Sequence, residues 1–241
     1  MFNSTVKTIL AAATATLSWG AIATTASAYD FVPQQEGEIN VGLGCYDGCI
    51  AIDPIFESII SLTDSSTGSR SRLFVDNLAT KSTYNGGQTV FQQKDAGTNF
   101  SGFFFRPSEY NESTGYAEEK GQLEVGTFEF TFASVISALT IDFFDTESTN
   151  TTGALAINGV SLTPDYVAKG RDGNLVSQTF FDVKSITLKF GNDTASGTGD
   201  GVNFKMAGEP AVGTPEPGTI TAGLMASSMI AAARKRQKRN G

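Results

Sequence analysis

The chain contains no histidine in 241 residues, and it has only two cysteines and one tryptophan. Without histidine, the sequence excludes Ser-His-Asp and Cys-His nucleophile systems, imidazole-ligated zinc and a switch based on imidazole titration. Basic side chains are also scarce, because 17 Lys and Arg stand against 25 Asp and Glu, a net charge of -8. A chain this acidic is not expected to bind nucleic acid, which requires a basic face. The missing histidine is the main reason to expect a protein that is not an enzyme.

The N-terminal residues 1–28 have the three-part pattern of a secretory signal peptide. Lys7 supplies a positive charge, residues 9–22 are apolar, and Ala26 and Ala28 frame a small-residue cleavage site. We expect a signal helix that directs export, with signal peptidase cutting after Ala28. The alternative is a short buried helix, for which the Ala-Ser-Ala ending would be a coincidence.

The C-terminal part combines a proline-rich linker, residues 208–217, with an uncharged segment, residues 218–233. A basic tail follows, made of Arg234, Lys235, Arg236, Lys238 and Arg239. An uncharged segment followed by cations is a stop-transfer pattern, and it predicts a single-pass helix with the C-terminus in the cytoplasm. Sixteen helical residues span only about 24 Å, against about 30 Å of hydrocarbon. The pattern therefore indicates an anchor that holds the chain briefly.

Three consecutive residues in the linker, Pro215, Glu216 and Pro217, precede the apolar segment and the basic tail. This order resembles the PEP-CTERM sorting signal of bacterial exported proteins, over about the last 27 residues. The resemblance implies that a membrane peptidase of the exosortase type recognises the tripeptide and processes the chain near it. Residues 122–126 (Gln-Leu-Glu-Val-Gly) further resemble the LEVG subfamily. The family resemblance also implies an association with exopolysaccharide or biofilm.

Residues 29–207 form the exported domain. Between the two terminal signals the chain carries 24 acidic and 11 basic side chains, a net charge of -13. Short apolar runs at fairly regular spacing, separated by Gly, Asn, Asp and Ser, predict an all-β fold, an antiparallel β-sandwich of jelly-roll-like type. Strands are expected at residues 73–77, 100–105, 123–132, 139–144, 186–190 and 202–206.

Three local patterns predict more specific structure. Asn158-Gly159, between two apolar runs, predicts a hairpin with a type I′ turn. In residues 123–132 the apolar positions change phase at Gly126, which predicts one long strand with a glycine-containing bulge. Asp53 and Pro54 stand where an N-cap and the first helical residue would be, so a short helix is expected from there.

Cys45 and Cys49 are the only cysteine pair, and glycines flank them. In an exported protein this spacing favours a small disulfide. Two free thiols are an alternative, and a metal site is a second, although the chain lacks further soft ligands.

Acidic side chains gather in two regions that could supply oxygen ligands to Ca²⁺, the one candidate cofactor. Asp145, Glu147 and Asn150 follow an apolar strand, and Asp193 and Asp200 lie in a glycine-rich stretch. The alternative is that these are ordinary solvated turn residues. The same carboxylates could also form the acid and nucleophile pair of a glycosidase.

Aromatic residues supply a further set of candidates for ligand contact. Residues 103–105 and 143–144 place phenylalanine on both faces of a strand, so some of these rings are expected to be exposed. The remaining candidates for ligand contact are Tyr110 and Tyr116, because sugar platforms favour an aromatic ring with a polar group. Their alternative role is that of a solvated loop.

Together these patterns predict a non-enzymatic exported protein of the cell surface or extracellular matrix. Its expected partners are signal peptidase, an exosortase-type peptidase and exopolysaccharide. Two other functions stay open: a carbohydrate-binding module, either dependent on calcium or not, and a secreted glycan hydrolase that uses carboxylates.

Overall fold

The computed structural model describes residues 28–91, 102–117, 123–192 and 201–210. The expected signal helix and C-terminal sorting helix lie outside the described residues, apart from Ala28, which is exposed. Within the described ranges, no helix is long and apolar enough to cross a membrane.

Regular structure in these ranges is β-strand, with one 3-10 turn, η1 (Asn85–Gly87). The strands are β1 (Tyr29–Asp30), β2 (Gly37–Ile39), β3 (Phe56–Leu62), β4 (Ser71–Asn77), β5 (Ser82–Tyr84), β6 (Thr89–Phe91), β7 (Phe103–Glu109), β8 (Gly126–Phe144), β9 (Gly153–Ile157), β10 (Val160–Tyr166), β11 (Leu175–Phe190) and β12 (Asn203–Pro210). Every pairing between these strands is antiparallel. The all-β antiparallel prediction is therefore confirmed.

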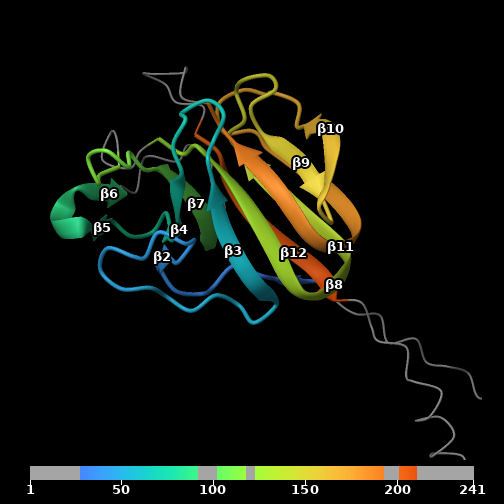
Figure 1. Cartoon of the computed structure of the whole chain (residues 1–241), viewed down its shortest axis with the longest axis horizontal. Helices are drawn as coiled ribbons and strands as arrows, with labels where there is room; N and C mark the ends of the chain where they lie inside the picture. The colour runs from blue at the N-terminus through green and yellow to red at the C-terminus, as the bar shows by residue number, and fades with distance from the viewer. Residues whose placement is uncertain (1–27, 92–101, 118–122, 193–200, 211–241) are drawn as a thin grey trace, which may run out of the picture.

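Ten of the strands form one sheet that folds over itself into a β-sandwich. One layer contains β10, β9, the second half of β11, the first half of β8, and β3. The other contains the first half of β11, the second half of β8, β12, β7, β4 and β2, with β1 beside β12. Figure 1 shows β8 and β11 running side by side and connecting the two layers.

The long strands bend at an irregularity in their pairing. Thr131 pairs with Ser185 and Ile136 pairs with Val183, so four residues of β8 lie opposite one residue of β11. That one residue is Lys184, whose Nζ donates hydrogen bonds to the carbonyl oxygens of residues 132 and 133. Since a bulge leaves backbone groups without a ladder partner, this lysine satisfies carbonyls that the bend exposes.

Phenylalanine rings from both layers fill the space between them. Phe204 of β12 stacks on Phe190 of β11 with ring centroids 4.2 Å apart, and it meets Phe130 of β8 at 5.8 Å. Phe56 of β3 contacts Phe105 of β7 across the sandwich at 6.3 Å. These contacts stabilise the packing of the two layers, because each buried aromatic side chain removes a large apolar area from water.

A second, smaller aromatic cluster lies on the outer face of β4. Phe74 contacts Tyr84 at 4.7 Å and Phe91 at 4.9 Å, both from the separate two-stranded sheet of β5 and β6. Phe104 is also fully buried, as are Phe105 and Phe143. The expectation that some of the Phe runs are exposed is wrong for these rings, because Phe105 and Phe143 belong to the main core and Phe104 is buried on the opposite face of β7.

The predicted helix after Asp53 is replaced by a turn and strand β3. Asp53 does act as a local hydrogen-bond acceptor, since its Oδ1 accepts from the amide of Ile55 at 2.8 Å and its carbonyl from the amide of Phe56 at 2.9 Å. The following residues pair with β8, so Phe56 and Ile59 point into the core while Ile60 is exposed. Tertiary pairing with β8 thus overrides the capping signal.

The strand predicted over residues 123–132 begins only at Gly126, and it continues through the separate strand predicted at 139–144. Gly126 does not form the predicted bulge. A Cβ at this position would lie 2.8 Å from the Cβ of Ser71 and 2.7 Å from the ring of Phe128. Glycine is required here for close packing. The apolar positions change phase at Gly126 because β8 begins there, so residues 123–125 do not belong to the same strand.

The hairpin predicted at Asn158-Gly159 is confirmed, because β9 and β10 pair antiparallel around it. Asn158 and Gly159 have φ values of 52° and 74°, the positive values of a type I′ turn. Tyr29 pairs with Gly208, so the first and last of the described strands lie side by side. β12 continues to Pro210, three residues into the stretch expected to be linker.

Candidate functional site

The predicted disulfide is confirmed and organises a loop on the outer side of β2. Cys45 and Cys49 are bonded, with their Cα atoms 5.4 Å apart. The loop is held by Glu38, whose carboxylate accepts from the amide of Tyr46 at 2.6 Å and whose carbonyl accepts from the amide of Ile50 at 3.0 Å. The disulfide therefore closes a loop that is already tied to the sheet.

Glu38 also pairs with Arg72 of β4, and both side chains are buried. The Arg72 guanidinium lies over the ring of Tyr46 at 3.7 Å and over the ring of Tyr110 at 4.5 Å. Burial raises the pKa of Glu38, although hydrogen bonds from Tyr46 and Arg72 oppose that rise. Tyr110, predicted to contact a ligand, thus packs against a buried cation through its ring face.

Tyr116, the second predicted ligand contact, is 49% exposed. It closes the loop after β7, because its carbonyl accepts from the amide of Asn111 at 3.0 Å. The structure therefore leaves the Tyr116 side chain accessible and engages Tyr110 in the Arg72 contact.

Three further buried ion pairs, two of them made by one arginine, join strands and loops of the domain. Arg106 of β7 is fully buried and pairs with Asp76 of β4 at 3.0 Å and with Glu124. Lys189 of β11 bonds both carboxylate oxygens of Asp64, at 2.9 Å and 2.7 Å. These contacts join segments that lie far apart in sequence, and the buried groups are not exposed to a ligand.

Three acidic side chains meet where β8 ends. The carboxylate oxygens of Asp145, Glu147 and Asp172 lie within 4.8 Å of one another. Of the predicted calcium ligands, Asp145 and Glu147 are therefore brought together. Asn150 is exposed in the same loop, with φ at 64°. Asp193 and Asp200 lie outside the described residues, and the sequence analysis missed Asp172.

Local hydrogen bonds fix the loops that carry this acidic cluster. Asp145 has a φ of 65°, and its Oδ1 accepts from the amide of Gly173 at 2.6 Å. Asn174 holds the same two loops together, since its side chain exchanges hydrogen bonds with the backbone of Thr146 at 3.0 Å and 2.6 Å. Fixed loops bearing oxygen ligands can bind a hard cation such as Ca²⁺.

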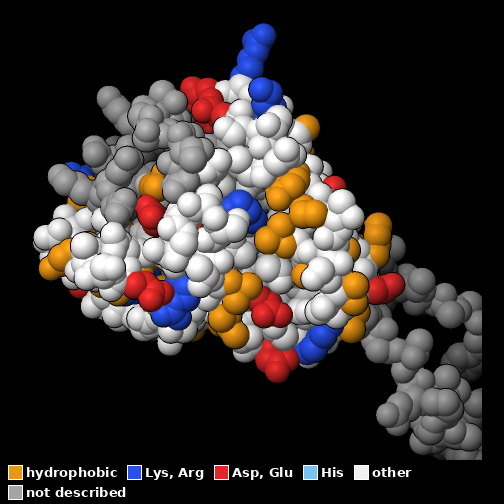
Figure 2. Space-filling view, turned by 45° about the horizontal axis from the view of Figure 1, so that its top comes forward, with side chains coloured by type: hydrophobic (Ala, Val, Ile, Leu, Met, Phe, Trp, Pro, Cys, Tyr) orange, Lys and Arg blue, Asp and Glu red, His pale blue; other side chains and the backbone are white. Residues whose placement is uncertain are grey.

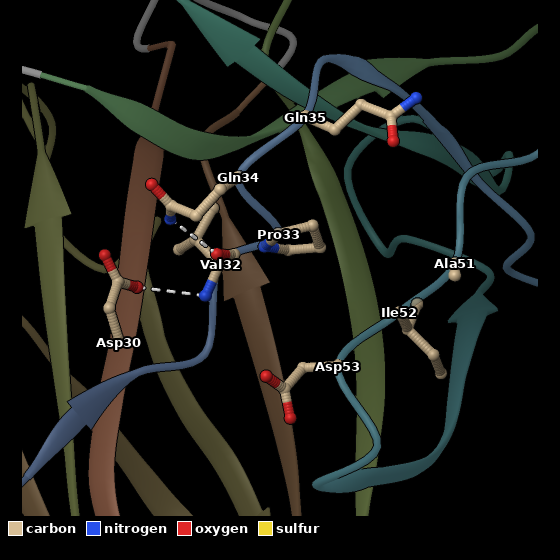
Figure 3. Close-up of a pocket in the computed structure, with 8 residues that line it drawn as sticks. All are labelled: Asp30, Val32, Pro33, Gln34, Gln35, Ala51, Ile52 and Asp53. Atoms are coloured by element: carbon tan, nitrogen blue, oxygen red, sulfur yellow. Dashed lines mark hydrogen bonds between the residues drawn. The ribbon is translucent and has the colours of Figure 1, made fainter.

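A groove of about 400 Å³ lies between the loop that follows β1 and the loop that precedes β3 (Figure 3). Its lining residues are Asp30, Val32, Pro33, Gln34, Gln35, Ala51, Ile52 and Asp53. Burial raises the pKa of Asp30, while a hydrogen bond from the Val32 amide opposes the rise. This groove was not predicted, because its two loops are 15 or more residues apart in sequence and neither carries a recognisable motif.

The remaining surface is mixed in character. On the face that Figure 2 shows, the described Lys and Arg side chains lie in several separate places, with two blue groups close together at the top, and hydrophobic side chains also reach the surface in several places. The most exposed large hydrophobic side chains are Phe181, at 69%, and Val160, at 65%. The described part of this face offers no continuous basic surface.

Comparisons with known proteins do not assign the chain to a family: no family model, no curated protein and no solved structure matches it.

Proposed function

We propose that this chain is a non-enzymatic exported protein of the cell surface or extracellular matrix, sorted through a PEP-CTERM signal. One observation carries the proposal. Among the described residues, the first strand begins at Tyr29, directly after Ala28, and the last strand runs to Pro210, five residues before Pro215. Cleavage after Ala28 and processing near Pro215 would therefore leave every described strand intact.

Two other features support export. The disulfide between Cys45 and Cys49 is typical of proteins that mature in an oxidising compartment. The acidic surface favours solubility outside the cell and disfavours contact with anionic membranes. In this proposal the sandwich is of jelly-roll-like type, and residues 1–28 and 218–241 form the signal helix and the sorting helix.

The mass of the protein recovered from the cell surface tests the proposal. We expect an N-terminus at Tyr29 and loss of residues 218–241. Glu216→Gln within the tripeptide is expected to leave the C-terminal segment attached, whereas the matched change Glu209→Gln, at the end of β12, leaves processing normal. A mature wild-type protein with its basic tail intact would contradict sorting and leave a single-pass anchor.

The acidic cluster favours a second candidate function, a calcium-dependent saccharide-binding module. Asp145, Glu147 and Asp172 bring three carboxylates together on two fixed loops. Millimolar calcium is then expected to raise the melting temperature, and Asp172→Asn is expected to remove the rise. Asp165→Asn, an exposed change in β10, is the control. The same melting temperature with calcium and with chelator would exclude the site.

A further inference from the structure

The groove between the loops after β1 and before β3 combines carboxylate, amide and apolar side chains. Asp30 and Gln34 come from the first loop, and Asp53 comes from the second. Figure 3 shows the Asp53 carboxylate on the side of its loop that faces the segment of Asp30 and Val32. The two loops come from different layers of the sandwich, so the groove exists only in the folded domain.

Each of the two carboxylates is held in place by a backbone amide two residues further along the chain. Asp30 Oδ1 accepts from the amide of Val32 at 2.9 Å, and Asp53 Oδ1 accepts from the amide of Ile55 at 2.8 Å. The second oxygen of each carboxylate has no hydrogen-bond partner among the described residues. These oxygens are therefore acceptors whose direction is set before any ligand arrives, which lowers the entropic cost of binding.

The amide side chains add donors to the same wall. Gln34 Nε2 donates to the carbonyl of Val32 at 2.8 Å, and this bond fixes the side chain (Figure 3). A primary amide has a second N–H and an oxygen acceptor, so Gln34 can still both donate and accept. Gln35 is exposed at the rim and offers the same pair of groups.

Apolar surface completes the groove. Pro33 and Ile52 line it beside the polar groups. Tyr29, the residue before Asp30, does not line the groove, and its ring packs against Phe31 at a centroid distance of 4.9 Å.

The carboxylate, amide and apolar groups that line the groove together favour one class of ligand. Fixed acceptors and donors beside apolar surface match a molecule that carries hydroxyl groups on a C–H framework. The two carboxylates repel uronates and sulfated sugars, and a bare cation would not use the amide donors. A volume of about 400 Å³ falls in the range of small-molecule sites.

We propose that this groove binds a neutral saccharide through its hydroxyl groups, with Asp30 and Asp53 as acceptors and Pro33 and Ile52 as the apolar surface. The inference shares only its ligand class, a saccharide, with the second candidate function, because it places binding in the groove and requires no calcium.

The test titrates the full chain in mild detergent with neutral trisaccharides, a β-glucan, an α-glucan and a mannan fragment, and with a uronate trisaccharide. Heat of binding is measured in millimolar calcium and, separately, in chelator. At least one neutral sugar is expected to bind, with the same affinity in chelator. Asp30→Asn and Asp53→Asn are each expected to weaken binding at least about tenfold, because a hydrogen bond to a charged group is lost. Asp165→Asn is the control, and unchanged melting temperatures show that the variants fold.

The outcomes separate this proposal from the others. If a sugar binds but chelator or Asp172→Asn abolishes binding while the groove variants retain it, the groove is wrong and the calcium-dependent function stands. Stronger binding of the uronate than of every neutral sugar would also overturn the groove. If no sugar binds, both saccharide proposals fail, and the export proposal is still judged by the mass of the surface protein.

Discussion

The buried Arg106 provides the sharpest test of what stabilises the sandwich. Its side chain has no exposed surface, and its guanidinium pairs with Asp76 at 3.0 Å and with Glu124, while lying 4.3 Å from the ring centroid of Phe91. Arg106→Met preserves much of the volume but removes the cation. Two buried carboxylates then lose their cationic partner, a change that costs about 3–5 kcal/mol when one member of a buried pair is removed.

An exposed pair in the same region provides the control. Arg70 pairs with Glu112 at 2.7 Å, but the two side chains are 36% and 50% exposed. Arg70→Met is therefore expected to cost less than about 1 kcal/mol. Urea unfolding at pH 7 measures both losses.

The pH dependence of stability tests independently whether removal of the cation beside the carboxylates causes the loss in Arg106→Met. Burial already raises the pKa of Asp76 in the presence of Arg106, and removing the cation raises it further. A carboxyl group with a raised folded pKa binds a proton more readily in the folded state, so stability falls as the pH rises from its unfolded pKa toward its folded pKa. The deficit of Arg106→Met is therefore expected to shrink between pH 7 and pH 5. Equal losses for the two arginine variants, or a deficit that grows on acidification, would refute the reasoning.

Three other predictions follow from the described contacts. Phe204→Ala is expected to cost about 3–5 kcal/mol in thermal or urea unfolding, whereas Phe181→Ala, at a site 69% exposed, changes stability by less than about 0.5 kcal/mol. Reducing the disulfide of Cys45 and Cys49 is expected to cost about 2 kcal/mol because the closed loop is short, and a thiol assay on the unreduced protein should detect no titratable thiols. Burial acts to raise the pKa of Asp64, but hydrogen bonds from its lysine and hydroxyl neighbours lower it overall. The stability that Asp64 contributes is complete above the usual aspartate pKa of about 3.9 and is lost as the pH falls below it, so Asp64→Asn should weaken the acid dependence of unfolding in that range.

Several predictions from the sequence succeeded because local chemistry is sufficient to determine them. Asn158-Gly159 forms its hairpin because both residues accept positive φ values. Cys45 and Cys49 form their disulfide because few alternatives exist for an isolated pair. Local signals were insufficient at Asp53, where a turn and a strand replaced the helix because pairing with β8 buries Phe56 and Ile59.

The candidate sites were harder to predict than the fold. Asp145 and Glu147 were found because they are near each other in sequence, whereas Asp172 joins them only through a distant loop. The sequence alone offers Tyr110 as a ligand contact, but in the folded domain the Arg72 guanidinium packs against its ring. The groove at Asp30 and Asp53 has no sequence signature, because neither loop is unusual by itself.

By itself, the sequence determined the all-β class, the hairpin at Asn158-Gly159 and the chemistry that a chain without histidine cannot perform. Those properties depend on composition, on alternation and on turn residues, which act over a few positions. Tertiary structure alone decided which charges are buried, how β8 and β11 join the two layers, and which loops enclose the groove. These features depend on contacts between residues far apart in the sequence, such as Asp64 and Lys189, which are 125 positions apart. Bringing such residues together costs chain entropy, and packing of the whole core supplies the free energy that offsets this cost.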